Sequence, residues 1–241
     1  MAPTVVLLHG FTHTGHSWDP VVATLGERYT AIAPDIRGHG DRASAEPVTL
    51  DAVIADIGQL APDRFALAGY SMGGRIALHA ALALPERVAR LVLIGASPGL
   101  ADPDERARRR DDDEALADEI ERSTIEEFAR RWAQTPVLAG LPPEVAAAVH
   151  ADRLRSTPPG LARALRGLGT GALAPLWDDL SELAMPVALI VGERDPKFQA
   201  IAAQMAAAIP AAQTHVVGGG GHAVHLEAPG LVASTISDTR R

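Results

Sequence analysis

The stretch Ala66–Leu84, "ALAGYSMGGRIALHAALAL", places Ser71 between two glycines in the pattern Gly-x-Ser-x-Gly. An apolar run precedes the serine and a run with helical spacing follows it, which predicts a turn between a buried strand and a helix. In such a turn the backbone is strained, and glycines two positions away on either side prevent collisions. The serine hydroxyl then stands at the tip of the strand. We therefore predict that Ser71 is a reactive residue and not only part of a turn.

Apolar runs like the one before Ser71 recur along the chain and alternate with helical patterns. Strands are expected at Thr4–Gly10, Tyr29–Asp35, Arg64–Tyr70, Val88–Gly95, Pro186–Glu193 and Thr214–Gly219. Helices are expected at about Ser17–Gly26, Leu50–Leu60, Ser71–Leu84, Pro196–Ala208 and Pro229–Ile236. This alternation predicts an α/β fold with a mostly parallel central sheet and helices on both faces.

One long segment, residues 97–180, has no strand pattern. It has helical patterns at Glu114–Gln134, Leu141–Ser156 and Gly160–Gly169, and a charged block at Glu105–Glu114 that is typical of a solvated helix start. Helices inserted at the carboxyl edge of a parallel sheet usually cover the crevice where ligands bind. We therefore predict a core made of residues 1–96 and 181–241, with residues 97–180 inserted between two strands as a helical cap.

Composition narrows the class of protein. The chain has 241 residues, of which 47% are hydrophobic, enough for one large core. It has no cysteine, which excludes disulfides and thiolate metal sites and permits a reducing cytoplasm. The net charge of -8 argues against nucleic acid as a partner. The apolar runs are too short to span a membrane, and the first residues lack the basic start of a signal peptide. We expect a cytoplasmic protein.

The strand-turn-helix context of Ser71 is that of the nucleophile elbow in the α/β-hydrolase fold. In this fold an acidic residue and then a histidine follow the serine along the chain. Asp195 in "LIVGERDPKF" and His222 in "GGGGHAVHLE" fit these two places, because each follows its strand after a turn-forming residue. Glu193 and His225 are the alternatives. The acid would fix the histidine tautomer, and the other ring nitrogen would face the serine.

The stretch "LLHGFTHTGHSW", Leu7–Trp18, follows the first expected strand and resembles the oxyanion loop of this fold. The backbone N–H groups of Phe11 and Met72 are expected to form the oxyanion hole. The stretch also contains three histidines, His9, His13 and His16. No carboxylate-rich motif accompanies them, so we predict no metal site, and no other motif indicates a cofactor.

Several arginines lie near the expected site. Arg75 comes one helical turn after the serine, and Arg109 and Arg153 lie in the cap. Guanidinium groups bind carboxylates with two hydrogen bonds, so these residues are candidates for binding a carboxylate. The alternative is that each arginine is a surface or ion-pair residue. Tyr70 and Trp132 are candidate pocket walls or core residues.

Beyond these general motifs, the chain resembles one family, the 2-succinyl-6-hydroxy-2,4-cyclohexadiene-1-carboxylate synthases of menaquinone biosynthesis. The resemblance spans almost the whole chain. It rests on "LLHGFTHTGHSW", "GYSMGGRIAL", "SPGL", "ERARRRDDDEALADEIE", "FARRWAQTPVL", "RLRSTPPGLARALRGLGTG", "GERDPKF" and "GGGHAVHLEAP". The "LRGLGTG" and "ERDPKF" stretches are the most specific, because many activities share the general hydrolase motifs.

The resemblance implies a lyase that expels pyruvate from an enolpyruvyl cyclohexene carboxylate and leaves a cyclohexadiene. It implies that Ser71, coupled to His222 and Asp195, acts as a base and forms no covalent intermediate. The N–H groups of Phe11 and Met72 would stabilise the enolate that forms as the proton leaves.

The resemblance also implies a multiply anionic substrate. Arg75, Arg109 and Arg153 would hold its carboxylates, with Lys197 as a further candidate. The helical cap would exclude water.

Two other functions stay open at this point. The first is a serine esterase or carbon–carbon hydrolase of the same fold, in which Ser71 would be acylated. The arginines argue against it, because a neutral substrate does not need them. The second is a ligand-binding protein with an idle triad, against which the complete Ser, Asp, His set argues. The sequence does not predict the oligomeric state.

Overall fold

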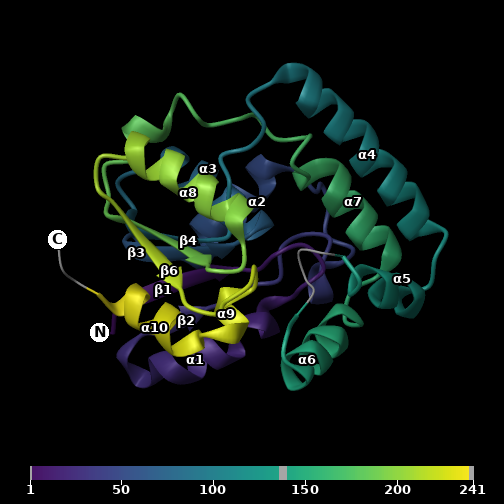
Figure 1. Ribbon diagram of the computed structural model, residues 1–241, viewed down its shortest axis with the longest axis horizontal. Coiled ribbons are helices and arrows are strands. Elements are labelled where there is room, and N and C mark those ends of the chain that lie inside the picture. Colours follow the sequence, from purple (N-terminus) through teal and green to yellow (C-terminus); the bar gives the residue numbers. More distant parts are fainter. Residues whose placement is uncertain (1, 136–139, 239–241) are drawn as a thin grey trace.

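The computed structural model describes residues 2–135 and 140–238 (Figure 1). The end of the "FARRWAQTPVL" stretch therefore lies outside the described residues. The six strands form one sheet in the order β2-β1-β3-β4-β5-β6, and every neighbouring pair is parallel. The strands are β1 Thr4–Leu8, β2 Thr30–Ile32, β3 Phe65–Tyr70, β4 Val88–Ile94, β5 Val187–Gly192 and β6 Ala212–Val217. The predicted parallel α/β fold is confirmed.

Helices cover both faces of the sheet (Figure 1). On one face lie α1 Asp19–Leu25, α9 Val224–Glu227 and α10 Pro229–Ser237, and on the other lie α2 Leu50–Leu60, α3 Met72–Ala83 and α8 Pro196–Ala208. The described residues include the 3₁₀ turns η1 Gly15–Trp18, η2 Gly26–Arg28, η3 Gly40–Arg42 and η5 Leu180–Glu182. The expected helices Leu50–Leu60 and Pro196–Ala208 have the predicted bounds.

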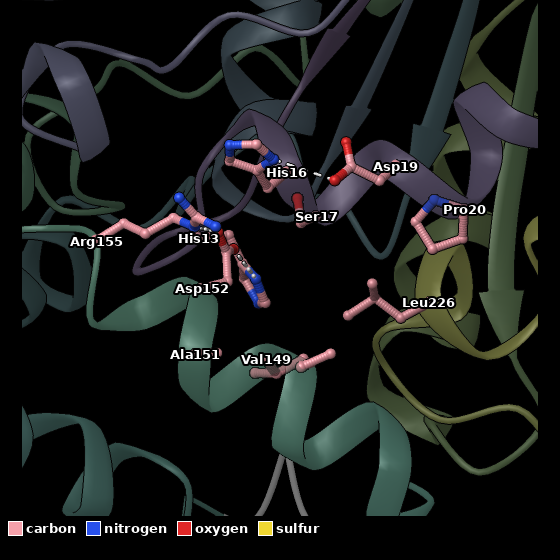
Figure 2. A pocket seen from close by; sticks show the side chains of 11 residues that line it. His13, His16, Ser17, Asp19, Pro20, Val149, Ala151, Asp152, Arg155 and Leu226 are labelled. Carbon is pink, nitrogen blue, oxygen red and sulfur yellow. Dashed lines mark hydrogen bonds and ion pairs between the residues drawn. The ribbon is translucent and has the colours of Figure 1, made fainter.

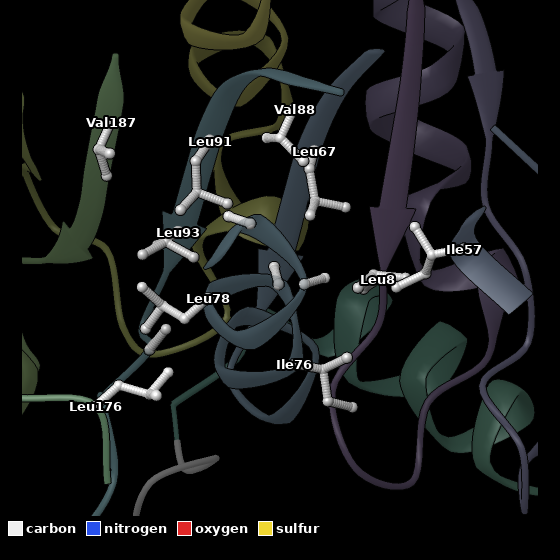
Figure 3. Close-up of a cluster of buried hydrophobic side chains, with 14 of the residues drawn as sticks. Leu8, Ile57, Leu67, Ile76, Leu78, Val88, Leu91, Leu93, Leu176 and Val187 are labelled. Atoms are coloured by element: carbon white, nitrogen blue, oxygen red, sulfur yellow. The ribbon is translucent and has the colours of Figure 1, made fainter. Parts of the chain in front are cut away.

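Side chains that alternate along the strands point to opposite faces of the sheet and pack into two separate hydrophobic clusters. Val5 and Leu7 of β1 pack with Trp18 and the α1–α10 layer, whereas Leu8 packs with Ile76 and the opposite layer. Figure 3 shows this second cluster, in which strand leucines meet side chains of α2 and α3. All residues of β3 and β5 are buried, which explains their continuous apolar runs.

Among the described residues, four helices lie between β4 and β5 and form one side of the molecule (Figure 1). They are α4 Pro103–Glu121, α5 Ile125–Trp132, α6 Pro143–Arg153 and α7 Pro158–Leu168. We call residues 97–180 the helical insertion, and its described residues contain no strand. Its helices α4 and α7 share a small apolar cluster, and Arg166 of α7 forms ion pairs with three carboxylates of α4, from Glu114, Asp118 and Glu121.

The stretch Glu114–Gln134 is helical as expected, but the helix is interrupted and the structure has two helices there. Helix α4 begins before the charged block, at Pro103, and ends at Glu121. Thr124 then caps α5: its side chain accepts from the N–H of Glu127, and the Glu127 side chain accepts from the N–H of Thr124. This reciprocal pair satisfies two backbone donors and starts a new helix axis.

Replacing Thr124 with alanine is expected to lower the free energy of unfolding by about 1 kcal/mol, because one donor at the start of α5 loses its acceptor. Urea denaturation measures this change. Thr24→Ala is the matched control, since the Thr24 hydroxyl only donates to the carbonyl of Pro20 within α1. Equal stability of Thr124→Ala and wild type would show that the cap contributes nothing.

Within the described part of the chain, no helix is long and apolar enough to cross a membrane.

Candidate active site

The turn between β3 and α3 holds Ser71 in a strained conformation. Its backbone has φ 51° and ψ -111°, and a positive φ is unusual for a residue other than glycine. Its N–H donates to the carbonyl of Ile94 at 2.9 Å, which fixes the turn against β4. A Cβ at Gly69 would collide with the carbonyl of Gly73, and a Cβ at Gly73 with the carbonyl of Leu8. The two glycines are therefore required by close backbone approach.

The structure brings the three predicted triad residues together. His222 Nδ1 lies 2.6 Å from Asp195 Oδ2, and His222 Nε2 lies 3.3 Å from Ser71 Oγ. Asp195 and His222 are both buried, and the other carboxylate oxygen of Asp195 accepts from the N–H of Phe198 at the start of α8. Because the carboxylate holds the proton on Nδ1, Nε2 is free to accept a proton from Ser71. This arrangement can perform general base or nucleophilic chemistry.

The two alternative residues lie elsewhere. Glu193 is exposed and accepts from the N–H of Gly219 at 2.8 Å. His225 is fully buried, with its ring centroid 4.2 Å from that of Tyr70 and 4.9 Å from that of Trp18. Burial lowers the pKa of His225 well below its usual value, so its ring is uncharged and packs against the neighbouring aromatic rings.

The expected oxyanion loop lies beside the serine because β1 and β3 are neighbours. Leu8 pairs with Gly69, so Phe11 and Met72 follow the same edge of the sheet, three residues further on. Met72 is the first residue of α3, and the first N–H groups of a helix have no partner within it. Phe11 lies in a turn that is closed by the N–H of His13 donating to the carbonyl of Gly10 at 3.1 Å.

The three histidines of this loop contact different partners. His9 donates from Nδ1 to the carbonyl of Gly10 and accepts at Nε2 from the N–H of Ile36, both at 2.9 Å. His13 lies 3.2 Å from a carboxylate oxygen of Asp152, and His16 is exposed beside Asp19. In the described parts of the chain, no group of three or more His, Cys, Asp or Glu residues is arranged to hold a metal ion.

Two of the buried histidines predict that acid destabilises the protein. Burial lowers the pKa of His9 to about 4, and burial together with His9 lowers the pKa of His39 to about 3. In the unfolded chain these rings bind protons below about pH 6.5, whereas in the folded protein they stay neutral. Their stabilising contribution is therefore complete above pH 6.5 and is lost as the pH falls toward 4.

Between pH 7 and pH 5 we expect His39 alone to account for a loss of about 2 kcal/mol in the free energy of unfolding. Urea denaturation at both pH values measures the loss, and His39→Gln should reduce it by that amount. His16→Gln is the control, because His16 is exposed. The same pH dependence in wild type and His39→Gln would contradict the assignment.

Arg75 is a buried cation beneath the site. Its side chain is only 7% exposed, and its Nε has no hydrogen-bond partner among the described residues. Burial lowers its pKa to about 10; Arg109 nearby adds to this lowering, and Asp113 opposes it. A buried guanidinium without its own acceptor is unfavourable, so the position suits an anionic ligand that brings the missing acceptor.

Arg109 is placed differently. Its Nε donates to Asp113 at 2.7 Å, and its side chain is 44% exposed. Asp113 is itself buried and also accepts from the N–H of Gly171 at 3.4 Å. Arg109 therefore already has a carboxylate partner, which is the ion-pair alternative given for it from the sequence.

Arg153 faces the site from the end of α6. It is 2% exposed, its Nε donates to the hydroxyl of Thr12 at 3.3 Å, and one of its terminal nitrogens has no partner among the described residues. Burial lowers its pKa and raises that of the neighbouring Tyr70. Tyr70 is buried, with its ring centroid 5.3 Å from that of His222.

The two remaining candidates lie at the edge of the site. Trp132 is half-buried, with its ring centroid 5.4 Å from that of Phe11, so it can act as a wall. Lys197 is exposed on α8, with its Nζ 5.9 Å from the centroid of the Phe198 ring. The Phe198 ring in turn packs on His222. Lys197 therefore lies outside the buried set.

The structure adds three residues that the sequence analysis missed: Thr12, Asp113 and Asp152. The Arg109–Asp113 spacing of four residues was a usable signal on a helix. No comparable signal exists for Asp152, whose hydrogen-bond partner Thr14 is 138 residues away along the chain.

Comparison with known proteins places this geometry in a family. The model of the Alpha/beta hydrolase family matches residues 5–235. A protein of Bacillus subtilis (strain 168) is 36% identical over 97% of this chain and 89% of its own length. A 2-succinyl-6-hydroxy-2,4-cyclohexadiene-1-carboxylate synthase of Salmonella schwarzengrund (strain CVM19633) is 34% identical over 100% of this chain and 94% of its own. The chain belongs to this synthase family, within the α/β hydrolases.

A solved structure of this synthase family is also similar. The structure described as that of MenH from S. aureus has a TM-score of 0.92 and 30% sequence identity, and the match covers 98% of this chain and 92% of that one. Family membership and fold are therefore supported both by sequence and by three-dimensional similarity.

Proposed function

We propose that the protein is a lyase of menaquinone biosynthesis. It expels pyruvate from 2-succinyl-5-enolpyruvyl-6-hydroxy-3-cyclohexene-1-carboxylate and forms 2-succinyl-6-hydroxy-2,4-cyclohexadiene-1-carboxylate. The observation that carries the proposal is a complete Ser71–His222–Asp195 triad beside two buried arginines, Arg75 and Arg153, that both have unpartnered nitrogens in the described structure. The names of the relatives support the same reaction.

The reaction starts with the ring proton next to the succinyl carbonyl. Ser71 takes this proton while its own proton passes to His222 Nε2, and Asp195 stabilises the imidazolium that forms. The electrons of the broken C–H bond form an enolate, whose oxygen accepts from the N–H groups of Phe11 and Met72.

Collapse of the enolate then expels the leaving group. A double bond forms between ring carbons 2 and 3, the existing double bond moves to carbons 4 and 5, and the bond from carbon 5 to the ether oxygen breaks. The enolpyruvate that departs gains a proton and becomes pyruvate. No water is consumed, and no bond forms between Ser71 and the substrate.

The arginines and the helical insertion bind and enclose the substrate in this proposal. Arg75 and Arg153 bind carboxylates of the substrate, because buried guanidinium groups donate strong charge-assisted hydrogen bonds to them. Arg109 contributes a further positive charge beside Asp113, and Trp132 closes the side next to Phe11. The insertion acts as a cap that keeps water from the enolate.

Pyruvate release tests this function. The substrate is made in situ by the preceding enzyme of the pathway, and the rate without enzyme is subtracted because the substrate sheds pyruvate unaided. We expect release well above the unassisted rate. If the protein gave no acceleration but hydrolysed simple esters, it would be a serine esterase instead.

A further inference from the structure

Asp152, in the last turn of α6, connects the helical insertion to the oxyanion loop. Its Oδ2 accepts from the N–H of Thr14 at 3.0 Å and lies 3.2 Å from His13 Nδ1. Its Oδ1 accepts from the hydroxyl of Thr14. One buried carboxylate thus binds three donors of a loop that is far away in the sequence. None of these contacts belongs to the proton transfer described above.

At neutral pH Asp152 is ionised and His13 is uncharged. Burial alone would raise the pKa of Asp152, but the hydrogen bonds from His13 and Thr14 outweigh it and lower the pKa to about 2. Burial lowers the pKa of His13, so its ring is neutral and donates from Nδ1. The Asp152 carboxylate is therefore a permanent acceptor for the loop.

The bonded residues follow Phe11 directly. Thr12 has φ 70°, an unfavourable value for a residue branched at Cβ, and Arg153 donates to its hydroxyl. Thr14 and His13 are bound by Asp152. Neighbouring residues of α6 therefore hold all three residues after Phe11. A strained turn of this kind persists only when its surroundings fix it.

The loop residues Thr12, His13 and Thr14 are buried, and a cavity lies on the outer side of the loop. This cavity, of about 310 Å³, lies between α6 and the η1–α1 segment and is lined in part by His13 and Asp152. Figure 2 shows both side chains beside it. Other lining residues include Pro20, Val149 and Leu226. His13 is only 2% exposed and its ring packs edge-on against Tyr70 and His225, so the hydrogen bonds to Asp152 act together with this packing.

We propose that Asp152 is a positioning residue for the oxyanion hole. Through Thr14 and His13 it holds the Gly10–His13 turn so that the N–H of Phe11 points at the oxygen that gains charge. This rests on the proposed function. It also links substrate binding to the hole, because the adjacent Arg153 is a carboxylate-binding candidate.

Steady-state kinetics of pyruvate release separate this role from a structural one. Asp152→Ala is expected to lower kcat about 10²-fold, the effect of misplacing one oxyanion donor, while KM changes less than about threefold. Asp152→Asn should restore part of kcat, because its amide oxygen still accepts from Thr14. The control is Glu144→Gln, an exposed acidic residue in the first turn of α6, which should match wild type.

A second set of variants tests whether Asp152 acts through Thr14. Thr14→Val should also lower kcat. The kcat of the double variant Asp152→Ala/Thr14→Val should be no lower than that of Asp152→Ala. If Asp152→Ala does not fold, Asp152→Asn and Thr14→Val carry the test. Losses that appear only in KM, or that multiply in the double variant, would overturn the proposal.

Hydrogen exchange of the substrate-free protein gives a readout that is independent of the reaction. In Asp152→Ala the peptide covering residues 9–18 should exchange faster than in wild type, while the peptide covering β3 and α3 should not change. If wild type releases no pyruvate, the proposed function fails, and faster exchange would still show that Asp152 holds the loop. Unchanged exchange of residues 9–18 would overturn the proposal by itself.

Discussion

Replacing Ser71 with alanine is expected to lower kcat for pyruvate release about 10³-fold, the size of effect that a positioned general base provides. The hydroxyl lies 3.3 Å from His222 Nε2, and alanine leaves the ring nitrogen without the group that reaches the substrate. KM should stay close to the wild-type value, because the buried arginines are unchanged. Stopped-flow or coupled measurement of pyruvate gives both constants after subtraction of the unassisted rate.

The triad is expected to behave as one unit. His222→Asn should lower kcat by a similar factor, and Ser71→Ala/His222→Asn should be little worse than either single variant. Ser234→Ala is the control, because the Ser234 hydroxyl only donates to the carbonyl of Leu231 within α10. If Ser71→Ala kept most of the activity, another residue would be the base.

Replacing Arg75 with methionine is expected to lower kcat/KM for the anionic substrate about 10²-fold, because one charge-assisted contact to a carboxylate is lost. Arg75→Lys should keep part of the activity, since an ammonium group supplies the charge without the paired geometry. Hydrolysis of a small neutral ester, if wild type shows any, should change far less. Equal losses on both substrates would contradict carboxylate binding.

The stability of Arg75→Met should not fall with its activity. The guanidinium is buried with an unpartnered nitrogen, so an apolar side chain of similar size should leave the free energy of unfolding unchanged or raise it. Urea denaturation measures this. Arg122→Gln is the control for both assays, because Arg122 is exposed on the helical insertion. A large loss of stability in Arg75→Met would indicate a structural role for the arginine.

The fold was largely predictable because most of its strands and helices are indicated by short stretches of their own sequence. Buried parallel strands read as continuous apolar runs, and the Gly-x-Ser-x-Gly turn fixes β3 and α3 on either side of Ser71. The break between α4 and α5 was missed, although Thr124 and Glu127 carry the spacing of a capping box. The capping box was a local indication of a new helix start, but the similar charged helical pattern on both sides of it favoured a continuous helix.

The candidate site was only partly predictable, because its electrostatics depend on contacts between distant residues. The sequence treats Arg75, Arg109 and Arg153 alike. The structure buries the first and the last, and gives Arg109 a carboxylate partner in Asp113. Contacts such as Asp152 to Thr14 join the helical insertion to the core and exist only after folding. The spacing of residues in the sequence predicts which side chains are neighbours on one helix or strand. It does not predict contacts between residues that are far apart in the sequence.

The central claim is that the protein eliminates pyruvate without using water. The most direct test incubates the wild-type protein with the enolpyruvyl cyclohexene substrate and determines the ring product by mass spectrometry beside the pyruvate released. We predict one cyclohexadiene for each pyruvate, at a rate above the unassisted reaction and dependent on Ser71. A ring product heavier by one water molecule, with a hydroxyl where the enolpyruvyl group was, would show hydrolysis and contradict the claim.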